Sequence, residues 1–252
     1  MIIDTPKNEQ LGSLRALWKE AFGDTDDFLD MFERTAFDRS RCRCVTLDGQ
    51  VAASLYWFDC SYSGRPIAYL YAIATSKAYR GRGLCRSLME DTHRHLRRLG
   101  YAGTILVPGS KELFTLYEKL GYTVCSNVGQ TECFASDNAA NIRQINKEAY
   151  AKARRRALPE GGVVQEKENL TFLSAMAELY IGEGFLLAAR RENNTLHGME
   201  LLGDISAAPH IVRALGCEKG YFRTQGNAVP FAMYYPLTAA QEYPTYFGLA
   251  FD

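Results

Sequence analysis

The chain has 252 residues, and its 29 basic and 29 acidic side chains give a formal net charge of zero. This balance excludes bulk electrostatic attraction to nucleic acid or to an acidic membrane surface, so any basic site must be local. The first residues lack the basic and then apolar pattern of a signal peptide, and no apolar run approaches the ~18 residues of a membrane span. We therefore expect a cytoplasmic protein without nucleic-acid or membrane partners.

The first 75 residues predict two helices followed by a strand meander. Residues 8–21 and 26–37 carry apolar side chains at helical spacing, and Thr25 or Asp26 is suited to cap the second helix. Two turns follow, at Asp48-Gly49 and in residues 61–66 (SYSGRP), each between apolar segments of strand length. The second turn leads into residues 67–75 (IAYLYAIAT), which read as a buried strand.

A third helix follows residue 83 and has a clear apolar stripe. Its leucines at 84, 88, 96 and 99 share one face, and Gly100 is placed to end the helix. We then expect a short strand at 104–108, a helix at 111–120 closed by Gly121, and strand-like segments near 122–126 and 131–135. These elements complete an α/β domain, residues 1–135.

The second half, residues 136–252, begins with a small polar linker, SDNAAN. A helix containing the arginine run of residues 152–162 comes next, and we expect those arginines on a solvated face. Residues 168–180 have a helical pattern, residues 184–203 predict a hairpin about Asn193-Asn194, and strands are expected near Tyr221 and Phe231. The alternation indicates an α/β or α+β fold.

A weak internal repeat relates residues 106–122 to residues 201–217. Both segments run from a strand end through a turn and a helix to a terminal Leu-Gly. Few side chains match, so the similarity fits either a duplication or two independent copies of a common strand-turn-helix unit.

The cysteines indicate neither a disulfide framework nor a metal site. Their odd number and the lack of a C-x-x-C pair favour free thiols in a reducing compartment. Cys42 and Cys44 are close in sequence, but the four histidines form no partner cluster at ligand spacing. The seven cysteines are Cys42, Cys44, Cys60, Cys85, Cys125, Cys133 and Cys217.

The stretch YRGRGLCRSLM, residues 79–89, lies between the buried strand and the third helix. Unpaired N–H groups and the positive end of the helix dipole converge there, which attracts phosphate. Gly81 and Gly83 permit positive φ and close backbone approach, and Arg80 and Arg82 add positive charge. The stretch is neither a Walker loop nor a dinucleotide fingerprint, and taken alone it fits an exposed basic turn better than a ligand site.

The order of elements, together with residues 67–89 and the segment FTLYEKLGY at 114–122, resembles the GNAT superfamily of acetyl-CoA-dependent N-acetyltransferases. The family signature is Arg or Gln, two residues, Gly, one residue, then Gly or Ala. Arg80, Gly83 and Cys85 occupy these places. Cys85 departs from the signature, although its side chain is small.

The resemblance covers about residues 1–135 and implies a mixed central sheet flanked by helices. Residues 136–252 lack the signature, and Val212 stands at the repeat position of Tyr117. This arrangement is similar to tandem members of the superfamily, in which a smaller, degenerate GNAT-like domain follows the catalytic one.

The resemblance also implies a site for acetyl-CoA as cosubstrate. Backbone groups at the strand end would bind the pantetheine arm, and the following loop would bind the pyrophosphate. Tyr117 matches the tyrosine that protonates the departing CoA thiolate, although a packed helix aromatic is the alternative. Many members carry Asn where this chain has Ser110, so no role is assigned there. The implied cofactor-binding residues are Ile73, Ala74, Thr75, Arg80, Gly81, Arg82, Gly83, Leu84 and Cys85.

We expect direct attack of a primary amine, from a small molecule or a peptide, on the thioester. Glu112, Asp59 and the chain-terminal carboxylate of Asp252 are candidate general bases. A covalent acyl-Cys85 route is the second chemistry, because a helix N-terminus acidifies a thiol. Two other functions stay open: a non-catalytic acyl-CoA sensor or scaffold, motivated by Cys85 and Ser110, and an aminoacyl or peptide-bond-forming transfer.

Overall fold

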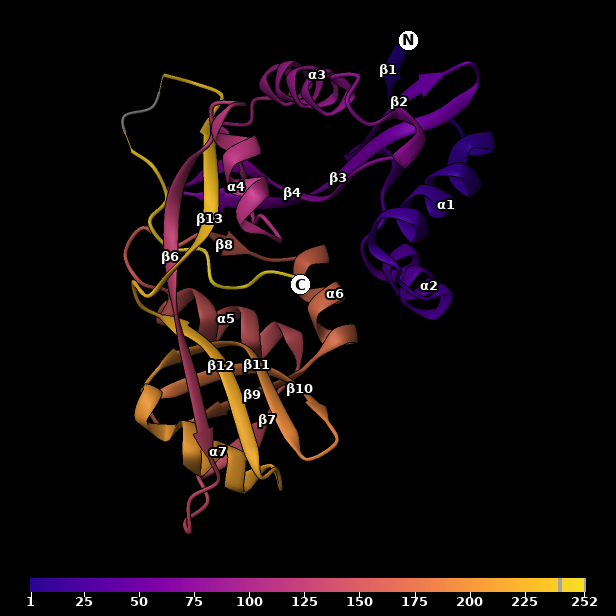
Figure 1. Ribbon diagram of the computed structural model, residues 1–252. Coiled ribbons are helices and arrows are strands. Elements are labelled where there is room, and N and C mark those ends of the chain that lie inside the picture. The colour runs from indigo at the N-terminus through magenta and orange to yellow at the C-terminus, as the bar shows by residue number, and fades with distance from the viewer. Residues whose placement is uncertain (240–241, 252) are drawn as a thin grey trace. The chain divides into compact units, whose positions relative to one another are not determined.

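The computed structural model describes residues 1–239 and 242–251 and has a mixed α/β architecture, as the sequence predicts (Figure 1). Its contacts divide the chain into two compact units. Unit 1 comprises Met1–Leu106 and Tyr235–Gln241, and unit 2 comprises Val107–Tyr234 and Glu242–Asp252. The bounds of these units differ from those of the expected domains, 1–135 and 136–252, which stay a prediction.

The strands of unit 1 are hydrogen-bonded in the order β1-β2-β3-β4-β5. The first four strands pair antiparallel, and β4 and β5 pair parallel. The strands are β1 (Ile2–Asp4), β2 (Cys42–Leu47), β3 (Gln50–Tyr62), β4 (Arg65–Thr75) and β5 (Gly103–Leu106). The helices are α1 (Leu11–Phe22), α2 (Asp26–Thr35) and α3 (Leu84–Arg98), with 3-10 turns at Asn8–Gln10, Arg39–Arg41 and Lys77–Tyr79.

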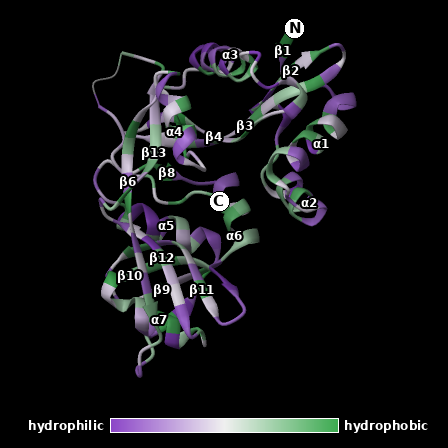
Figure 2. Cartoon of the chain, in the orientation of Figure 1, coloured by the Kyte–Doolittle hydropathy of each residue, from purple (hydrophilic) through white to green (hydrophobic). Residues whose placement is uncertain are grey.

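The helices of unit 1 cover both faces of its sheet, because side chains alternate along each strand. On β3, the Tyr56 ring meets Trp18 of α1 at 5.1 Å between centroids. The adjacent Trp57 meets His95 of α3 at 6.0 Å, on the opposite face. Figure 2 shows hydrophobic and hydrophilic segments alternating along α3, as expected for a helix that buries one face.

Short-range signals placed the turns and caps of unit 1 correctly. Asp48 and Gly49 have φ of 49° and 81°, and Ser63 and Gly64 have φ of 48° and 73°. Two consecutive positive φ values match the right-handed twist of the flanking strands, so both hairpins form as predicted. The Thr25 side chain accepts from the Phe28 N–H and caps α2.

The strands of unit 2 are hydrogen-bonded in the order β13-β6-β12-β11-β10-β9-β7. Only the β11–β12 pair is parallel among these described strands. The strands are β6 (Thr123–Phe134), β7 (Ile142–Gln144), β8 (Val164–Gln165), β9 (Glu178–Gly182), β10 (Phe185–Glu192), β11 (Thr195–Gly203), β12 (Lys219–Gln225) and β13 (Val229–Pro236). The helices are α4 (Lys111–Glu118), α5 (Lys147–Ala157), α6 (Glu168–Met176) and α7 (Ala208–Ala214), with a 3-10 turn at Ile205–Ala207.

Neighbouring residues of β11 face the two layers of helices in unit 2. Leu201 belongs to the hydrophobic core that Ile211 and Val212 of α7 complete. Glu200 contacts Arg154 of α5 instead. The alternation of a core leucine and a buried carboxylate follows the two-residue period of a strand.

Three expectations for unit 2 were wrong. The two segments expected near 122–126 and 131–135 form one continuous strand, β6, because β12 and β13 hydrogen-bond along it in succession. The helix expected over 168–180 ends at Met176, and its last residues enter β9, which pairs with β10. In the arginine run, Arg154 is buried, whereas Arg155 and Arg156 are exposed.

In the described part of the chain, every helix is too short or too polar to cross a membrane.

Candidate functional site

β4 contains a β-bulge close to its C-terminal end. Ser54 pairs with Ala74 and Tyr56 pairs with Tyr71, so one residue of β3 opposes two residues of β4, Ala72 and Ile73. Ala72 has a φ of 48°, which is uncommon for a residue with a side chain. Such a bulge bends the strand and changes the direction of the backbone groups that follow it.

The segment Ile73–Thr75 is paired along one edge only. On the β3 side, Ala53 pairs with Thr75 and Ser54 with Ala74. On the other side, the parallel ladder with β5 covers Ile67–Tyr69, and no described strand continues it. An extended ligand could therefore pair with this strand end, as an added strand does.

The loop after β4 has the backbone geometry of an anion site. Gly81 and Gly83 have φ of 75° and 76°, and a Cβ atom at either position would meet nothing within 4 Å. Gly83 is the N-cap of α3 and provides no side-chain cap, so the first N–H groups of this 15-residue helix face the loop. These N–H groups and the helix dipole favour a phosphate there.

The two arginines of the loop are exposed but differ in their contacts. The Arg80 Nε donates to the Thr75 carbonyl oxygen at 3.1 Å and so ties the loop to the strand end. The Arg82 guanidinium lies 5.3 Å from the centre of the Tyr79 ring. Of the two arginines, Arg82 therefore contributes less to holding the loop in place.

The Leu84 side chain is buried and that of Cys85 is half-buried, so only the backbone of these two residues could serve the predicted site. The Leu84 side chain is buried in the core under α3. Burial raises the pKa of the Cys85 thiol, which keeps it protonated near neutral pH. A protonated thiol is a poor nucleophile, and this disfavours the covalent acyl-Cys85 route.

Tyr117 lies on α4, which belongs to unit 2, whereas Ile73–Cys85 belongs to unit 1. The predicted cofactor-binding residues therefore lie together in unit 1, whereas Tyr117 lies in unit 2. The Tyr117 ring is buried and meets the Tyr122 ring edge-on, with centroids 5.8 Å apart. The ring therefore has the packing role that was the alternative, and the role of its hydroxyl stays a proposal.

The candidate bases differ in their surroundings. A hydrogen bond with Ser110 lowers the pKa of Glu112, which makes it a weaker base. Asp59 accepts from the Tyr101 hydroxyl and pairs with Arg41 at 3.5 Å. Asp252 lies outside the described residues.

The two repeat segments end their helices in the same way. The Tyr122 N–H donates to the Tyr117 carbonyl at 3.0 Å, and the Cys217 N–H donates to the Val212 carbonyl at 3.0 Å. Gly121 and Gly216 follow the helices with positive φ. The backbone correspondence places Val212 at the position of Tyr117, as the repeat predicts.

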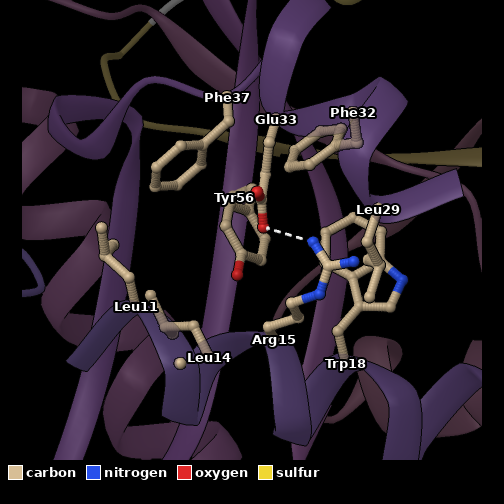
Figure 3. A pocket seen from close by; sticks show the side chains of 10 residues that line it. Leu11, Leu14, Arg15, Trp18, Leu29, Phe32, Glu33, Phe37 and Tyr56 are labelled. Carbon is tan, nitrogen blue, oxygen red and sulfur yellow. Dashed lines mark hydrogen bonds and ion pairs between the residues drawn. The ribbon is translucent and has the colours of Figure 1, made fainter. Parts of the chain in front are cut away.

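Sequence reasoning missed a pocket in unit 1. It has a volume of about 300 Å³ and lies among α1, α2 and β3 (Figure 3). The helical spacing of apolar residues predicted both helices but not that a gap separates them above β3. The lining residues are Leu11, Gly12, Leu14, Arg15, Trp18, Leu29, Phe32, Glu33, Phe37 and Tyr56.

No group of three or more metal-ligating side chains is found among residues 1–239 and 242–251.

Residues 3–125 match the family model described as an acetyltransferase (GNAT) domain. No curated protein matches the chain. Among solved structures, the chain resembles a GCN5-related N-acetyltransferase from Kribbella flavida, at 17% identity and a TM-score of 0.73 over 94% of this chain and 72% of that one.

Two further solved structures share the fold over nearly the whole chain. A putative acetyltransferase from Pyrococcus horikoshii is 14% identical, with a TM-score of 0.64 over 98% of this chain and 93% of that one. A tandem GNAT protein from the clavulanic acid biosynthesis pathway is 8% identical, with a TM-score of 0.57 over 95% of this chain and 100% of that one. The family model and the shared fold agree with the arrangement of β4, its loop and α3, and residues 3–125 are matched as a GNAT acetyltransferase domain.

Proposed function

We propose that the protein transfers an acetyl group from acetyl-CoA to a primary amine of a small molecule or peptide. One observation carries the proposal: the half-paired end of β4 leads, through a single 3-10 turn, into a glycine loop at the uncapped N-terminus of α3. This order offers a strand edge and then an anion site, which matches a ligand with an amide-containing arm and a pyrophosphate.

In this proposal, Ile73, Ala74 and Thr75 pair with the pantetheine arm through their backbone. The N–H groups from Gly81 to Cys85 and the Arg82 guanidinium bind the pyrophosphate, while Arg80 holds the loop against Thr75. The bulge directs backbone N–H groups toward the thioester oxygen, where negative charge develops in the transition state.

The reaction forms a carbon–nitrogen bond and breaks the carbon–sulfur bond of the thioester. The unprotonated amine attacks the carbonyl carbon, the CoA thiolate leaves with the electron pair, and the nitrogen gives up a proton. The products are the N-acetyl amine and CoA. We propose that the Tyr117 hydroxyl gives the proton to the sulfur.

Residues 136–252 form a degenerate second domain in this proposal. The position that corresponds to Tyr117 is Val212, which has no hydroxyl and is fully buried in the core of unit 2. The second segment therefore lacks the proton donor that the first one offers.

Calorimetric titration with acetyl-CoA tests the loop. The loss of one charged contact to phosphate in Arg82→Gln should weaken binding about tenfold. Arg98→Gln is the matched control, since Arg98 is an exposed arginine at the other end of α3. Equal affinities of the wild type and Arg82→Gln would contradict the assignment.

Steady-state kinetics across a panel of amines tests the proton donor. Tyr117→Phe should lower kcat by about 100-fold, in the range of general acid catalysis, without changing acetyl-CoA affinity. Tyr122→Phe removes a hydroxyl from the neighbouring ring and should keep its activity. The second candidate function is an acyl-CoA sensor, because Cys85 departs from the family signature. Tight acetyl-CoA binding without transfer to any amine would support this second function.

A further inference from the structure

Glu20, in the last turn of α1, contacts the backbone that joins β4 to the glycine loop. Its Oε1 atom accepts from the Lys77 N–H at 2.6 Å and from the Ser76 hydroxyl at 3.4 Å. Lys77 begins the 3-10 turn Lys77–Tyr79, and Ser76, at the N-cap of this turn, provides no side-chain cap. The first N–H groups of a helical turn have no partners within the turn. Glu20 therefore supplies, from another helix, the acceptor that this turn lacks.

The core of unit 1 fixes α1 in place. Leu14, Leu17 and Trp18 of this helix are buried. The Trp18 ring also meets the Tyr71 ring, with centroids 5.7 Å apart, and Tyr71 directly precedes the bulged residues of β4. The same helix thus contacts β4 before the bulge and, through Glu20, the backbone that follows the strand.

The glycine loop, residues 80–83, depends on its anchors for its shape. Gly81 and Gly83 have positive φ, and a Cβ atom at either position would meet nothing within 4 Å. Glycine loses more conformational freedom on ordering than any other residue. Contacts at the start of the loop must therefore offset this cost if the loop is to keep one conformation.

Two of these anchors join the start of the loop to the strands of unit 1. The Ser76 N–H donates to the Ala52 carbonyl oxygen at 2.9 Å, and the Arg80 Nε donates to the Thr75 carbonyl oxygen at 3.1 Å. Both acceptors lie on strands, β3 and β4. Glu20 adds an anchor of a different kind, because it fixes the turn between these two bonds to a helix.

We infer that Glu20 is a positioning residue for acetyl-CoA: its carboxylate holds the turn Lys77–Tyr79, and through it the glycine loop, in the conformation that binds the pyrophosphate. The inference rests on the proposed function for the ligand and on these contacts for the residue. A loop that adopts the binding conformation only part of the time lowers the apparent affinity by the same fraction. Glu20 acts through the loop and has no direct part in acetyl transfer.

Electrostatics alone predicts the opposite effect for this residue. A carboxylate close to the loop repels phosphate, so that its removal would strengthen binding. Loss of the acceptor for the Lys77 N–H would weaken binding instead. Glu20→Ala removes both the charge and the acceptor, whereas Glu20→Gln removes the charge and keeps an amide oxygen that accepts. The two variants therefore separate the effects.

Calorimetric titration with acetyl-CoA compares these variants with the wild type. The Kd should rise about fivefold in Glu20→Ala, which loses one hydrogen bond to a charged group, and should stay within about twofold of the wild type in Glu20→Gln. Glu9→Ala removes an exposed carboxylate just before α1 and should leave the Kd unchanged. Unchanged or tighter binding by Glu20→Ala would overturn the inference, and so would equal weakening in both Glu20 variants.

Steady-state kinetics separates positioning from a loss of folded protein. Glu20→Ala should raise the KM for acetyl-CoA about fivefold and leave kcat and the KM for the amine close to those of the wild type. A lower kcat at an unchanged KM for acetyl-CoA would indicate a smaller fraction of active enzyme. That result would overturn the positioning role.

Amide hydrogen exchange of the free protein tests the contact without any ligand. Peptides that cover residues 76–83 should exchange faster in Glu20→Ala than in the wild type, Glu20→Gln or Glu9→Ala. Equal exchange in all four proteins would overturn the inference, whatever the outcome with acetyl-CoA. Faster exchange in Glu20→Ala, together with a wild type that binds no acetyl-CoA, would refute the proposed function and still support Glu20 as the residue that holds this loop.

Discussion

At the residue scale, the ion pair of Arg154 and Glu200 joins α5 to β11 in the interior of unit 2. Glu200 accepts from the Arg154 Nε at 2.6 Å, from its Nη2 at 3.0 Å and from the Tyr246 hydroxyl at 3.0 Å. The Arg154 Nη1 donates to the Val163 carbonyl oxygen at 3.3 Å. Because these partners satisfy both groups, the cost of burying the charges is offset.

Glu200→Gln should therefore destabilise the protein strongly, because it leaves the Arg154 charge buried without a counter-charge. We expect a loss of about 3–5 kcal/mol in the free energy of unfolding, measured by urea denaturation. Glu166→Gln breaks the exposed pair with Arg155 and should cost far less, because solvent screens that pair. Similar losses in the two variants would contradict the buried-charge argument.

His93 gives a pH dependence of stability. Burial, followed by the charge of Arg97, lowers the pKa of His93 from its ordinary 6.5 to about 4. The unfolded chain takes up this proton at a higher pH than the folded one. The contribution of neutral His93 to the free energy of unfolding is therefore complete above pH 6.5 and is lost as the pH falls toward 4. Its size is about 3 kcal/mol.

His93→Phe keeps a ring against Tyr235, which stacks on His93 at 4.2 Å between centroids, and removes the titration. The free energy of unfolding of the wild type should fall more steeply than that of the variant between pH 6.5 and 4. Parallel pH profiles would show that the folded and unfolded states bind the His93 proton equally, so that folding does not lower its pKa.

At the element scale, the N-terminus of α3 depends on backbone conformation rather than on space. Gly83 and Gly12 both have room for a Cβ atom, but only Gly83 has a positive φ, of 76°. The same substitution at the two positions therefore isolates the cost of the left-handed conformation.

Gly83→Ala should lower the free energy of unfolding by about 1–2 kcal/mol, the cost of a side chain in that conformation. Gly12→Ala, inside α1, should raise it by up to about 1 kcal/mol, because alanine is the better helix former. Urea denaturation of both variants measures the difference. Changes of the same sign would contradict the conformational explanation.

At the scale of the whole molecule, unit 1 is completed by a segment from far along the chain. The Leu237 N–H donates to the Ala102 carbonyl oxygen at 2.9 Å, and the Arg97 Nε donates to the Leu237 carbonyl oxygen at 2.8 Å. Tyr235 adds its stacking on His93. The core of this unit therefore draws on residues more than 130 positions apart in sequence.

A fragment of residues 1–135, the predicted catalytic domain, should consequently be less stable than the full chain. It lacks Tyr235–Leu237, and its β6 lacks both partner strands, β12 and β13. We expect a lower midpoint of urea denaturation and weaker acetyl-CoA binding. A fragment with the midpoint and affinity of the full chain would contradict this expectation and would support independent folding of residues 1–135.

The sequence predicted the features that adjacent residues control. The two hairpins of unit 1, the Thr25 cap and the glycines around α3 follow from backbone conformations that only certain residues adopt. The glycine–arginine loop was found for the same reason. Resemblance to a family added the expected ligand and the candidate Tyr117, which periodicity could not distinguish from a packed aromatic.

Tertiary structure alone decided the burial of Arg154, the continuity of β6 and the pocket beside Trp18. Glu200 is 46 residues from Arg154, β12 and β13 begin 85 or more residues beyond the end of β6, and three separate elements line the pocket. Local sequence fixes which backbone conformations are allowed, whereas burial and pairing depend on which distant segments meet. For this reason the chain by itself revealed the loop and the helices, and only the folded molecule revealed the buried charge and the aromatic pocket.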